Sequence, residues 1–475
     1  MGGKKIWTFL PHNLKIIPTT FLTLPQLSYI GSMFSDEGWL FFKSGFFSYS
    51  TKLALVLIGL LYTYIIANAL GPASYGKAMF VLAFIGNLVY LFGVEVFGDA
   101  LIVFMPQFRS KRLFLKFAKI LLATFLVLFV LFYLFSPQIP ELIGRGNALL
   151  FQYALPLFIV FPFFLIFEAL FKGMKSFGKV LKVSVAESIA NLCLAAFFLI
   201  VLHQGIESVI FAKITSVAFA SLIYFYLFSR SRFEEKEIDS IAVKRYVKNI
   251  FAMSILKKLN SQVVLLYIGL FIPSVAMGLY YIAEKIASYA VEMPTTAIAE
   301  AMLPFASGKA KDKKALSSFI SMNIKLALTL GIILGFFVLL IGKFLLGILF
   351  PNFAEAFWLL PLFILFYLVN SLTFLTNAYR SINRADILVK SAILMLATTS
   401  LFGYFLILIY GIYGLLLAQI LSNFIVFSFL YLKQKDVGLE IKILPRFKDI
   451  CFFASLFKHA FARGLNSFGF FNKKG

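Results

Sequence analysis

Charged side chains are scarce in this chain: Asp, Glu, Lys and Arg make up 14% of its 475 residues, whereas 61% are hydrophobic. A soluble domain of this length needs far more polar side chains to cover its surface. The shortage therefore excludes an ordinary soluble protein and indicates that much of the surface faces lipid. Lys and Arg outnumber Asp and Glu by 44 to 21. Because basic residues collect in cytoplasmic loops and contact anionic headgroups, this excess predicts a membrane protein and no nucleic-acid partner.

Patterns for metal binding and catalysis are missing as well. The two cysteines, Cys193 and Cys451, belong to no CxxC pair, and the three histidines lie far apart in the chain. We therefore expect no structural disulfide, no metal site and no cofactor. The sequence has no Walker motif, no Asp-rich motif and no nucleophile beside a base. Its internal loops are too short to form an extramembrane domain, so we expect that the chain is not an enzyme.

Long uncharged runs predict transmembrane helices. A helix needs roughly 20 apolar residues to cross the hydrocarbon, and the runs 53–76 and 259–282 contain no charged residue. The uncharged run 391–432 is long enough for two crossings, which we divide at Gly411. The predicted fold class is an all-α integral membrane protein. Together with runs interrupted by single charges, the pattern predicts about twelve transmembrane helices, centred near residues 61, 88, 128, 160, 193, 218, 264, 288, 334, 367, 399 and 422.

The loops between the predicted helices alternate in charge. Every second loop is basic, as are both termini, whereas the intervening loops contain almost no Lys or Arg. By the positive-inside rule, this alternation places both termini in the cytoplasm of a multi-pass plasma (inner) membrane protein. The basic loops are 109–119, 172–182, 230–248, 309–314 and 380–390.

The two halves of the chain repeat each other. The segment 70–76 matches 271–278 with one inserted residue, and Gly205 and Ile206 match a second Gly-Ile pair that begins at Gly411. The offset covers six predicted helices, an even number, so the halves have the same orientation and a relating axis along the membrane normal, as in parallel-repeat transporters. Two such bundles imply a cavity between them and a rocking motion.

This repeat defines the predicted domains. They are an N-terminal interfacial or cytoplasmic extension (1–46), an N-terminal six-helix bundle (47–228), a charged cytoplasmic linker (229–248), a C-terminal six-helix bundle (249–432) and a cytoplasmic tail (433–475) with an amphipathic helix over 449–466.

Several short motifs resemble those of a known family. They are IIANALGPASYG at 65–76, GVEVFG at 93–98, VAMGLYY at 275–281, AMLP at 301–304 and YGIYG at 410–414. The set resembles the polysaccharide-biosynthesis flippases, the Wzx-type branch of the multidrug/oligosaccharidyl-lipid/polysaccharide (MOP) superfamily, whose fold is MATE-like, and the resemblance covers roughly residues 44–432. It implies a flippase that moves polyprenyl-diphosphate-linked oligosaccharides from the cytoplasmic to the outer leaflet by alternating access, for surface polysaccharide biosynthesis. The implied partners are this substrate, membrane lipids and other polysaccharide-assembly proteins.

Three other functions remain open. A multidrug or cation exporter of the same superfamily shares the fold, but it needs acidic cavity residues, whereas the spans here are basic. A lipid II flippase usually has a further pair of helices. A membrane glycan polymerase or ligase usually needs a large outer loop, which this chain does not have. Flippases of the resembling family often carry an acidic residue in the seventh span, where this chain has NSQVV at 260–264.

Lysines inside the spans are candidate ligands for the substrate's diphosphate, because cationic groups that face a cavity offset its charge. Lys52 and Lys257 occupy equivalent positions in the two halves, at the start of the first and seventh spans. The alternative is that these lysines extend to the lipid headgroups. The candidates are Lys52, Lys213, Lys257, Lys258 and Lys325.

Acidic residues inside the spans are candidates for H⁺ or Na⁺ coupling. Glu95 and Asp99 lie one helical turn apart, so both carboxylates are on one face of the second span. The alternative is a buried ion pair with a lysine of a neighbouring helix. The candidates are Glu95, Asp99, Glu187, Glu284 and Glu292.

Overall fold

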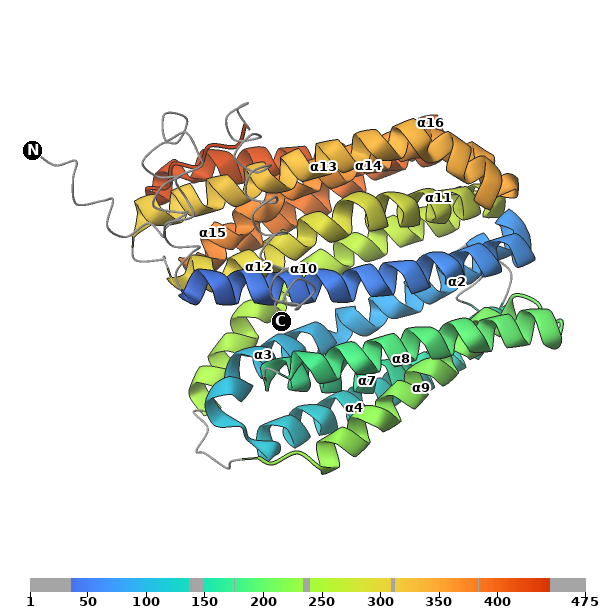
Figure 1. Ribbon diagram of the computed structural model, residues 1–475, viewed down its shortest axis with the longest axis horizontal. Helices are drawn as coiled ribbons and strands as arrows, with labels where there is room; N and C mark the ends of the chain where they lie inside the picture. Colours follow the sequence, from blue (N-terminus) through green and yellow to red (C-terminus); the bar gives the residue numbers. More distant parts are fainter. Residues whose placement is uncertain are drawn as a thin grey trace, which may run out of the picture.

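Helices account for most of the structure, and no strand occurs among the residues that it describes. Figure 1 shows the helices side by side, approximately along the long axis of the molecule. The predicted all-α membrane fold is confirmed. The computed structural model describes residues 36–444, apart from 136, 137, 139–147, 175, 234–239, 309–311 and 383.

The helices are as follows. The first half contains α2 (Asp36–Val89), η4 (Tyr90–Val94), α3 (Glu95–Phe108), α4 (Lys111–Leu134), α6 (Ala148–Ala154), α7 (Leu157–Gly173), α8 (Phe177–Ala196), η5 (Phe197–Val201) and α9 (Glu207–Ser229). The second half contains α10 (Ser240–Phe271), α11 (Ser274–Ala287), η6 (Ser288–Glu292), α12 (Met293–Gly308), α13 (Lys313–Leu349), η7 (Pro351–Leu359), α14 (Leu360–Leu372), η8 (Thr373–Leu375), α15 (Thr376–Ser381), α16 (Ala385–Lys433) and η9 (Lys435–Val437).

Two helix starts fall inside segments that we assigned to extensions and linkers. Helix α2 begins at Asp36, within the predicted extension 1–46, and α10 begins at Ser240, within the predicted linker 229–248. The predicted tail helix at 449–466 lies outside the described residues.

Within the described part of the chain, eight helical stretches are long and apolar enough to cross a membrane. Two of them, Leu53–Met105 and Ala385–Val437, each contain two helices that meet at a kink. Helix α10 and the stretch from α11 to α12 are not among the eight, because polar and charged residues interrupt them. The multi-pass character is therefore confirmed, whereas the predicted count of twelve is reached only if these two more polar stretches also cross.

Glycine forms both kinks. Gly71 has φ 70° and ψ 172°, and Gly411 has φ 56° and ψ −131°. These positive φ angles cost glycine little and are strained for residues with a Cβ atom. The chain can therefore reverse direction at these two positions without a longer loop. The break that we predicted at Gly411 is confirmed.

A π-helical turn interrupts the second helix of each half at corresponding places. The turn η4 ends directly before Glu95, and the turn η6 ends at Glu292, the residue that the repeat aligns close to Glu95. Single π turns within helices occur frequently at functional sites. The shared irregularity supports the internal repeat and draws attention to both carboxylates.

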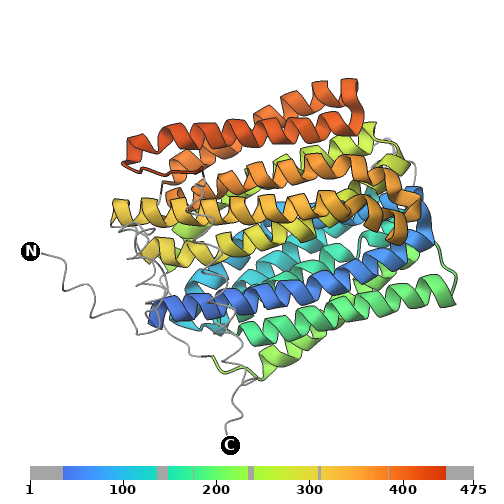
Figure 2. The ribbon, with the colours of Figure 1, turned by 45° about the horizontal axis from the view of Figure 1, so that its top comes forward.

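The helices of each half pack mainly on one another. In the first half α8 packs on α9, and α7 packs on α3, α4 and α9; in the second half α10 packs on α16, and α13 packs on α12 and α14. The two halves meet chiefly where α2 lies against α11, with further contacts of α2 and α3 to α10. Figures 1 and 2 both show α13 and α16 on the opposite side of the molecule from α4 and α9.

The contact between α2 and α11 is closest at two glycines that the repeat pairs. A Cβ atom on Gly76 would lie 2.5 Å from the Ser274 carbonyl oxygen and 2.6 Å from the backbone nitrogen of Gly278. A Cβ atom on Gly278 would overlap the carbonyl of Pro72. Only glycine permits this approach, so α2 and α11 come closest just after the Gly71 kink.

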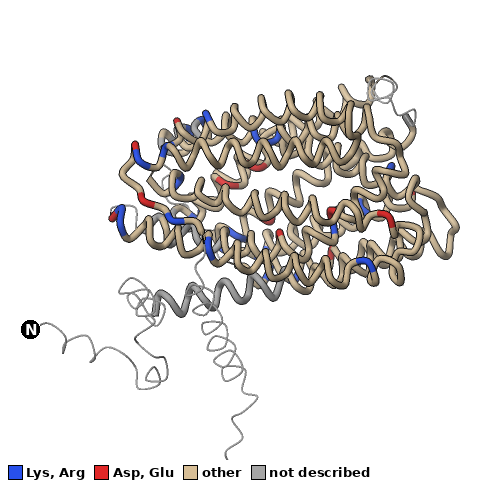
Figure 3. Tube along the Cα trace, turned by 90° about the horizontal axis from the view of Figure 1, so that it is seen from above, with Lys and Arg blue, Asp and Glu red and all other residues tan. Residues whose placement is uncertain are grey.

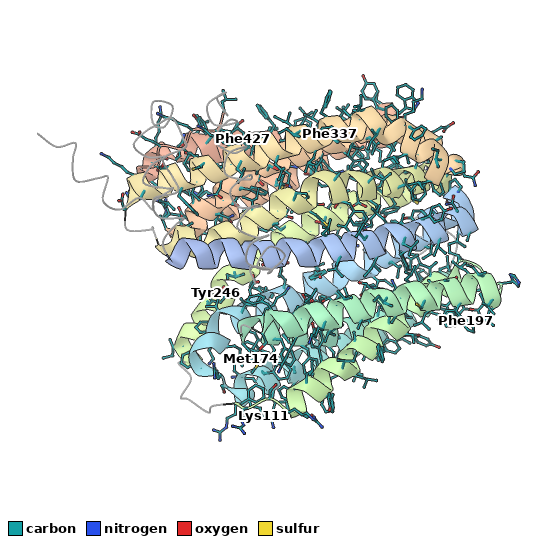
Figure 4. All side chains as sticks on the ribbon, viewed as in Figure 1. Lys111, Met174, Phe197, Tyr246, Phe337 and Phe427 are labelled. Atoms are coloured by element: carbon teal, nitrogen blue, oxygen red, sulfur yellow. The ribbon has the colours of Figure 1, made fainter. Side chains whose placement is uncertain are left out.

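Large apolar side chains cover the outer faces of the helices. Figure 4 shows Phe337 projecting from the second half and Phe197 from the first. Phe337 is 53% exposed and Phe344, two turns further on, is 69% exposed. Apolar patches of this extent are rare on soluble monomers and fit a surface in contact with lipid.

Candidate functional site

A cavity of about 520 Å³ lies where α2 of the first half meets the second half. Helices α10, α11, α14 and α16 form its other walls. The volume falls within the range of roughly 300–1,000 Å³ that is typical of small-molecule sites.

Helical spacing explains how each wall presents one face to the cavity. On α2 the lining residues Met79, Leu82 and Ala83 recur at intervals of three and one, so they share a face. On α10 the lining residues Asn260 and Val264 lie one turn apart. The α2 wall is therefore mainly apolar, whereas the α10 wall includes the polar amide of Asn260.

Four buried polar atoms at this cavity have no hydrogen-bond partner. They are Asn260 Oδ1, the Tyr281 hydroxyl, Thr399 Oγ1 and Gln419 Nε2, and all four residues line the cavity. Most buried polar atoms in proteins are paired, so each exception requires an explanation. Their convergence on one cavity makes it the candidate site, since water or a polar ligand there would satisfy them.

Glu284 and Lys285 place one negative and one positive charge on the wall of the same cavity. The two side chains also interact electrostatically with each other. Their charges offset, so the cavity contains charged groups but carries no net charge from its described lining residues. Such a site favours neutral polar ligands over strongly charged ones.

A second group of charges joins the two halves beside the cavity. Lys258 Nζ of α10 lies 3.3 Å from Glu95 Oε2 of α3 and 4.5 Å from the centre of the Tyr90 ring. Asp99 and Lys257 lie close enough to interact electrostatically with this pair, and Arg380 of α15 interacts in turn with Asp99 and Lys257. Figure 3 shows acidic and basic residues inside the helical body in addition to the basic residues at its ends.

A third group lies within the first half. Lys213 Nζ of α9 is 2.9 Å from Glu187 Oε1 of α8, which also accepts a hydrogen bond of 3.0 Å from the Ser216 hydroxyl. The side chain of Glu187 is 10% exposed and that of Lys213 is 30% exposed. The arrangement is an ion pair between neighbouring helices, the alternative that we considered for the acidic candidates.

The remaining candidates are dispersed. Glu292 accepts a hydrogen bond from the Ser288 hydroxyl on the π turn η6. Lys325 lies half-buried on α13. The side chain of Lys52 lies outside the described residues. The structure thus brings Glu95, Asp99, Lys257 and Lys258 together, brings Glu187 to Lys213, and places Glu284 at the cavity.

Neutral residues of the cavity were missed by the sequence reasoning, which selected candidates by charge. Tyr281, Thr399 and Gln419 were not candidates, and Asn260 was noticed only because it is not acidic. Amide side chains inside otherwise apolar spans were the available signal, because each needs a partner when it leaves water.

These features define a multi-pass helical membrane protein with a polar cavity at the boundary between its two halves. Residues 65–353, more than half of the chain, match the family described as polysaccharide biosynthesis protein. The chain belongs to this family, whose members in the MOP superfamily are transporters or flippases. No curated protein sequence matches it.

Several solved structures with the same fold are MATE transporters. An inward-facing multidrug resistance MATE family transporter of the MOP superfamily is 14% identical, with a TM-score of 0.64 over 82% of this chain and 98% of that chain. An outward-facing structure of such a transporter has a TM-score of 0.57 at 16% identity, over 82% and 96% of the two chains. The Vibrio cholerae MATE transporter VcmN has a TM-score of 0.61 at 13% identity, over 84% and 97%. At these identities the similarity establishes the fold alone.

Proposed function

We propose that this protein is a flippase that moves polyprenyl-diphosphate-linked oligosaccharides from the cytoplasmic to the outer leaflet of the plasma membrane. The observation that supports this most directly is the polar cavity at the boundary between two like halves, in a chain of the polysaccharide biosynthesis family. A diphosphate and its sugars cannot cross hydrocarbon unaided. The protein can hold them between its two halves while the lipid tail stays in the bilayer.

Lysines beside the cavity supply charge for the diphosphate. Lys257 and Lys258 begin the part of α10 whose next turn reaches the cavity at Asn260. In the structure Lys258 is paired with Glu95 across the two halves. When the halves separate, this pair breaks and its ammonium group becomes free to bind phosphate oxygens.

The orientation in the membrane is tested by cysteine labelling. We expect cysteines at Ser274 and Tyr413 to react with an impermeant reagent added outside intact cells, and cysteines at Ser176 and Ser307 not to react. Outside labelling at Ser176 would reverse the proposed topology.

The transport function is tested in cells that lack the protein. We expect lipid-linked glycan to accumulate on the cytoplasmic leaflet and to be protected from a glycan-modifying enzyme added outside. Restoration of the gene should return the glycan to the outer leaflet. An unchanged distribution between the leaflets in deleted cells would contradict the proposal.

Export of organic cations is the second candidate, because the solved structures of the same fold include multidrug transporters. Glu284 is the one carboxylate among the described residues that line the cavity, and the Lys285 charge beside it offsets it. This arrangement disfavours a cationic ligand. Efflux of a cationic dye that depends on this protein would favour the second candidate.

A further inference from the structure

The four unpartnered polar atoms of the cavity differ in their hydrogen-bonding character. Asn260 Oδ1 accepts, Gln419 Nε2 donates, and the hydroxyls of Tyr281 and Thr399 do both. Three of the residues are more than nine-tenths buried: Asn260 is 7%, Tyr281 5% and Thr399 1% exposed. A ligand that satisfies them must carry several donors and acceptors around a compact body.

Aromatic rings form part of the same cavity. Tyr280, Tyr281 and Phe366 all line it, and the first two rings meet edge to face with centres 5.4 Å apart. Rings of this kind give a ligand a flat apolar surface beside the polar groups. The cavity therefore combines ring faces with scattered hydrogen-bonding atoms, and Glu284 and Lys285 leave it without net charge.

We propose that this cavity binds an uncharged sugar ring of the transported glycan, while the diphosphate stays outside it near Lys257 and Lys258. A pyranose ring has an apolar face for the aromatic rings and hydroxyl groups that both donate and accept hydrogen bonds. A diphosphate has no donors for Asn260 Oδ1 and brings charge that the cavity does not offset. This inference rests on the proposed function, since it assigns the part of the substrate that the cavity takes.

Helix α2 closes the sugar cavity from the other half of the protein. Asn87 Nδ2 donates hydrogen bonds of 2.8 Å to Gln262 Oε1 and 3.2 Å to the Lys258 carbonyl oxygen. Met79, Leu82 and Ala83 form the rest of this wall. Because the α2 wall belongs to the first half, separation of the halves removes it and opens the cavity to the sugar.

The test compares one substitution at two sites. Thr399→Val removes an unpartnered buried hydroxyl that faces the cavity. Thr329→Val removes an unpartnered buried hydroxyl on α13 that does not line it, and Thr329 is 7% exposed. Both changes keep the side-chain shape and remove an unpaired polar atom, so neither should lower the melting temperature.

The binding measurement uses the purified full-length protein in detergent. The probes are glucose, galactose and N-acetylglucosamine at millimolar concentration, and the readout is the sugar-induced shift in melting temperature. We expect at least one sugar to stabilise the unmodified protein and Thr329→Val equally. Thr399→Val should bind that sugar roughly fivefold more weakly, as expected for one lost hydrogen bond.

Export of lipid-linked glycan in cells is measured for the same two variants. Loss of export in Thr399→Val alone supports the sugar cavity even where the three probes do not bind, because the native sugar then differs from them. Equal export by both variants, at equal abundance and with equal sugar binding, overturns the sugar cavity while the flippase function stands. If the unmodified protein exports no lipid-linked glycan, the proposed function fails. In that case, the sugar-cavity proposal still stands if a sugar binds and only Thr399→Val weakens its binding. If no sugar behaves in this way, the sugar-cavity proposal is overturned as well.

Discussion

Substitution of Gly278 by alanine should prevent the two halves from closing where α11 meets α2, just after the Gly71 kink. The added Cβ atom would overlap the Pro72 carbonyl, with 2.8 Å to its carbon atom. Both partners are backbone atoms, so no flexible side chain can move away. The change should therefore disfavour the conformation in the structure and leave conformations in which α2 and α11 separate unaffected.

The size of this effect follows from the cost of overpacking. Inserting a methyl group into a filled contact costs typically about 1–3 kcal/mol. If the cost applies to the closed state alone, the ratio of closed to open protein falls by about 5- to 150-fold. A ligand that binds each state equally well would not restore this ratio.

The assay follows the reactivity of one cysteine in the cavity. Ala83 lines the cavity on α2 and is replaced by cysteine in a chain whose Cys193 and Cys451 are replaced by serine. We expect an impermeant reagent added outside to label this position slowly in the parent and at least fivefold faster after Gly278→Ala. Gly86→Ala is the matched control on α2, because its Cβ atom would meet nothing within 4 Å.

Two results would refute this reasoning. Equal labelling rates for Gly278→Ala and the parent, at equal abundance, would show that the glycine contact does not set the closed state. Faster labelling in Gly86→Ala as well would show that any alanine in this region loosens the protein. In both cases the close approach would be a packing detail without a role in alternating access.

Two ion pairs and one serine hydroxyl provide further predictions. Glu95→Gln should lower the free energy of unfolding by at most about 1 kcal/mol, because its pair with Lys258 is partly exposed. A cysteine placed at the basic end of the helices should also react faster in this variant, because an ion pair between the two halves is lost. Lys213→Ala should lower the free energy of unfolding by about 1–3 kcal/mol, because Glu187 is left buried without its cation; denaturation of the double variant with Glu187→Gln should show partial recovery. Ser321→Ala should loosen the segment after η9, because Lys442 N donates a 2.9 Å hydrogen bond to the Ser321 hydroxyl, and limited proteolysis should cut that segment sooner.

Several features of the fold could be predicted from local sequence patterns. Uncharged runs of spanning length require helices, because an unpaired backbone group in hydrocarbon is costly. The break at Gly411 was visible because glycine interrupts a run that is too long for one crossing. The correspondence between the segments at Gly76 and Gly278 was also visible in the sequence, although nothing in it indicated that these two glycines touch.

Helix bounds were less predictable, since they depend on contacts beyond the local pattern. Helix α2 begins at Asp36 and α10 at Ser240, in segments whose charged or aromatic residues suggested extensions and linkers. A helix can continue through such residues where neighbouring helices or interfaces favour it. An uncharged run marks only the part of a helix that lies in the hydrocarbon.

The sequence by itself determined the class of the protein, because hydrophobic length and basic loops depend on neighbouring residues and the repeat can be found by comparing the chain with itself. Only the tertiary structure decided which polar residues act together. Asn260, Thr399 and Gln419 lie far apart in the chain, and each looks like an isolated polar residue in an apolar helix. Packing of α10 against both α16 and α2 brings them to one cavity, and the missing hydrogen-bond partners become apparent only there.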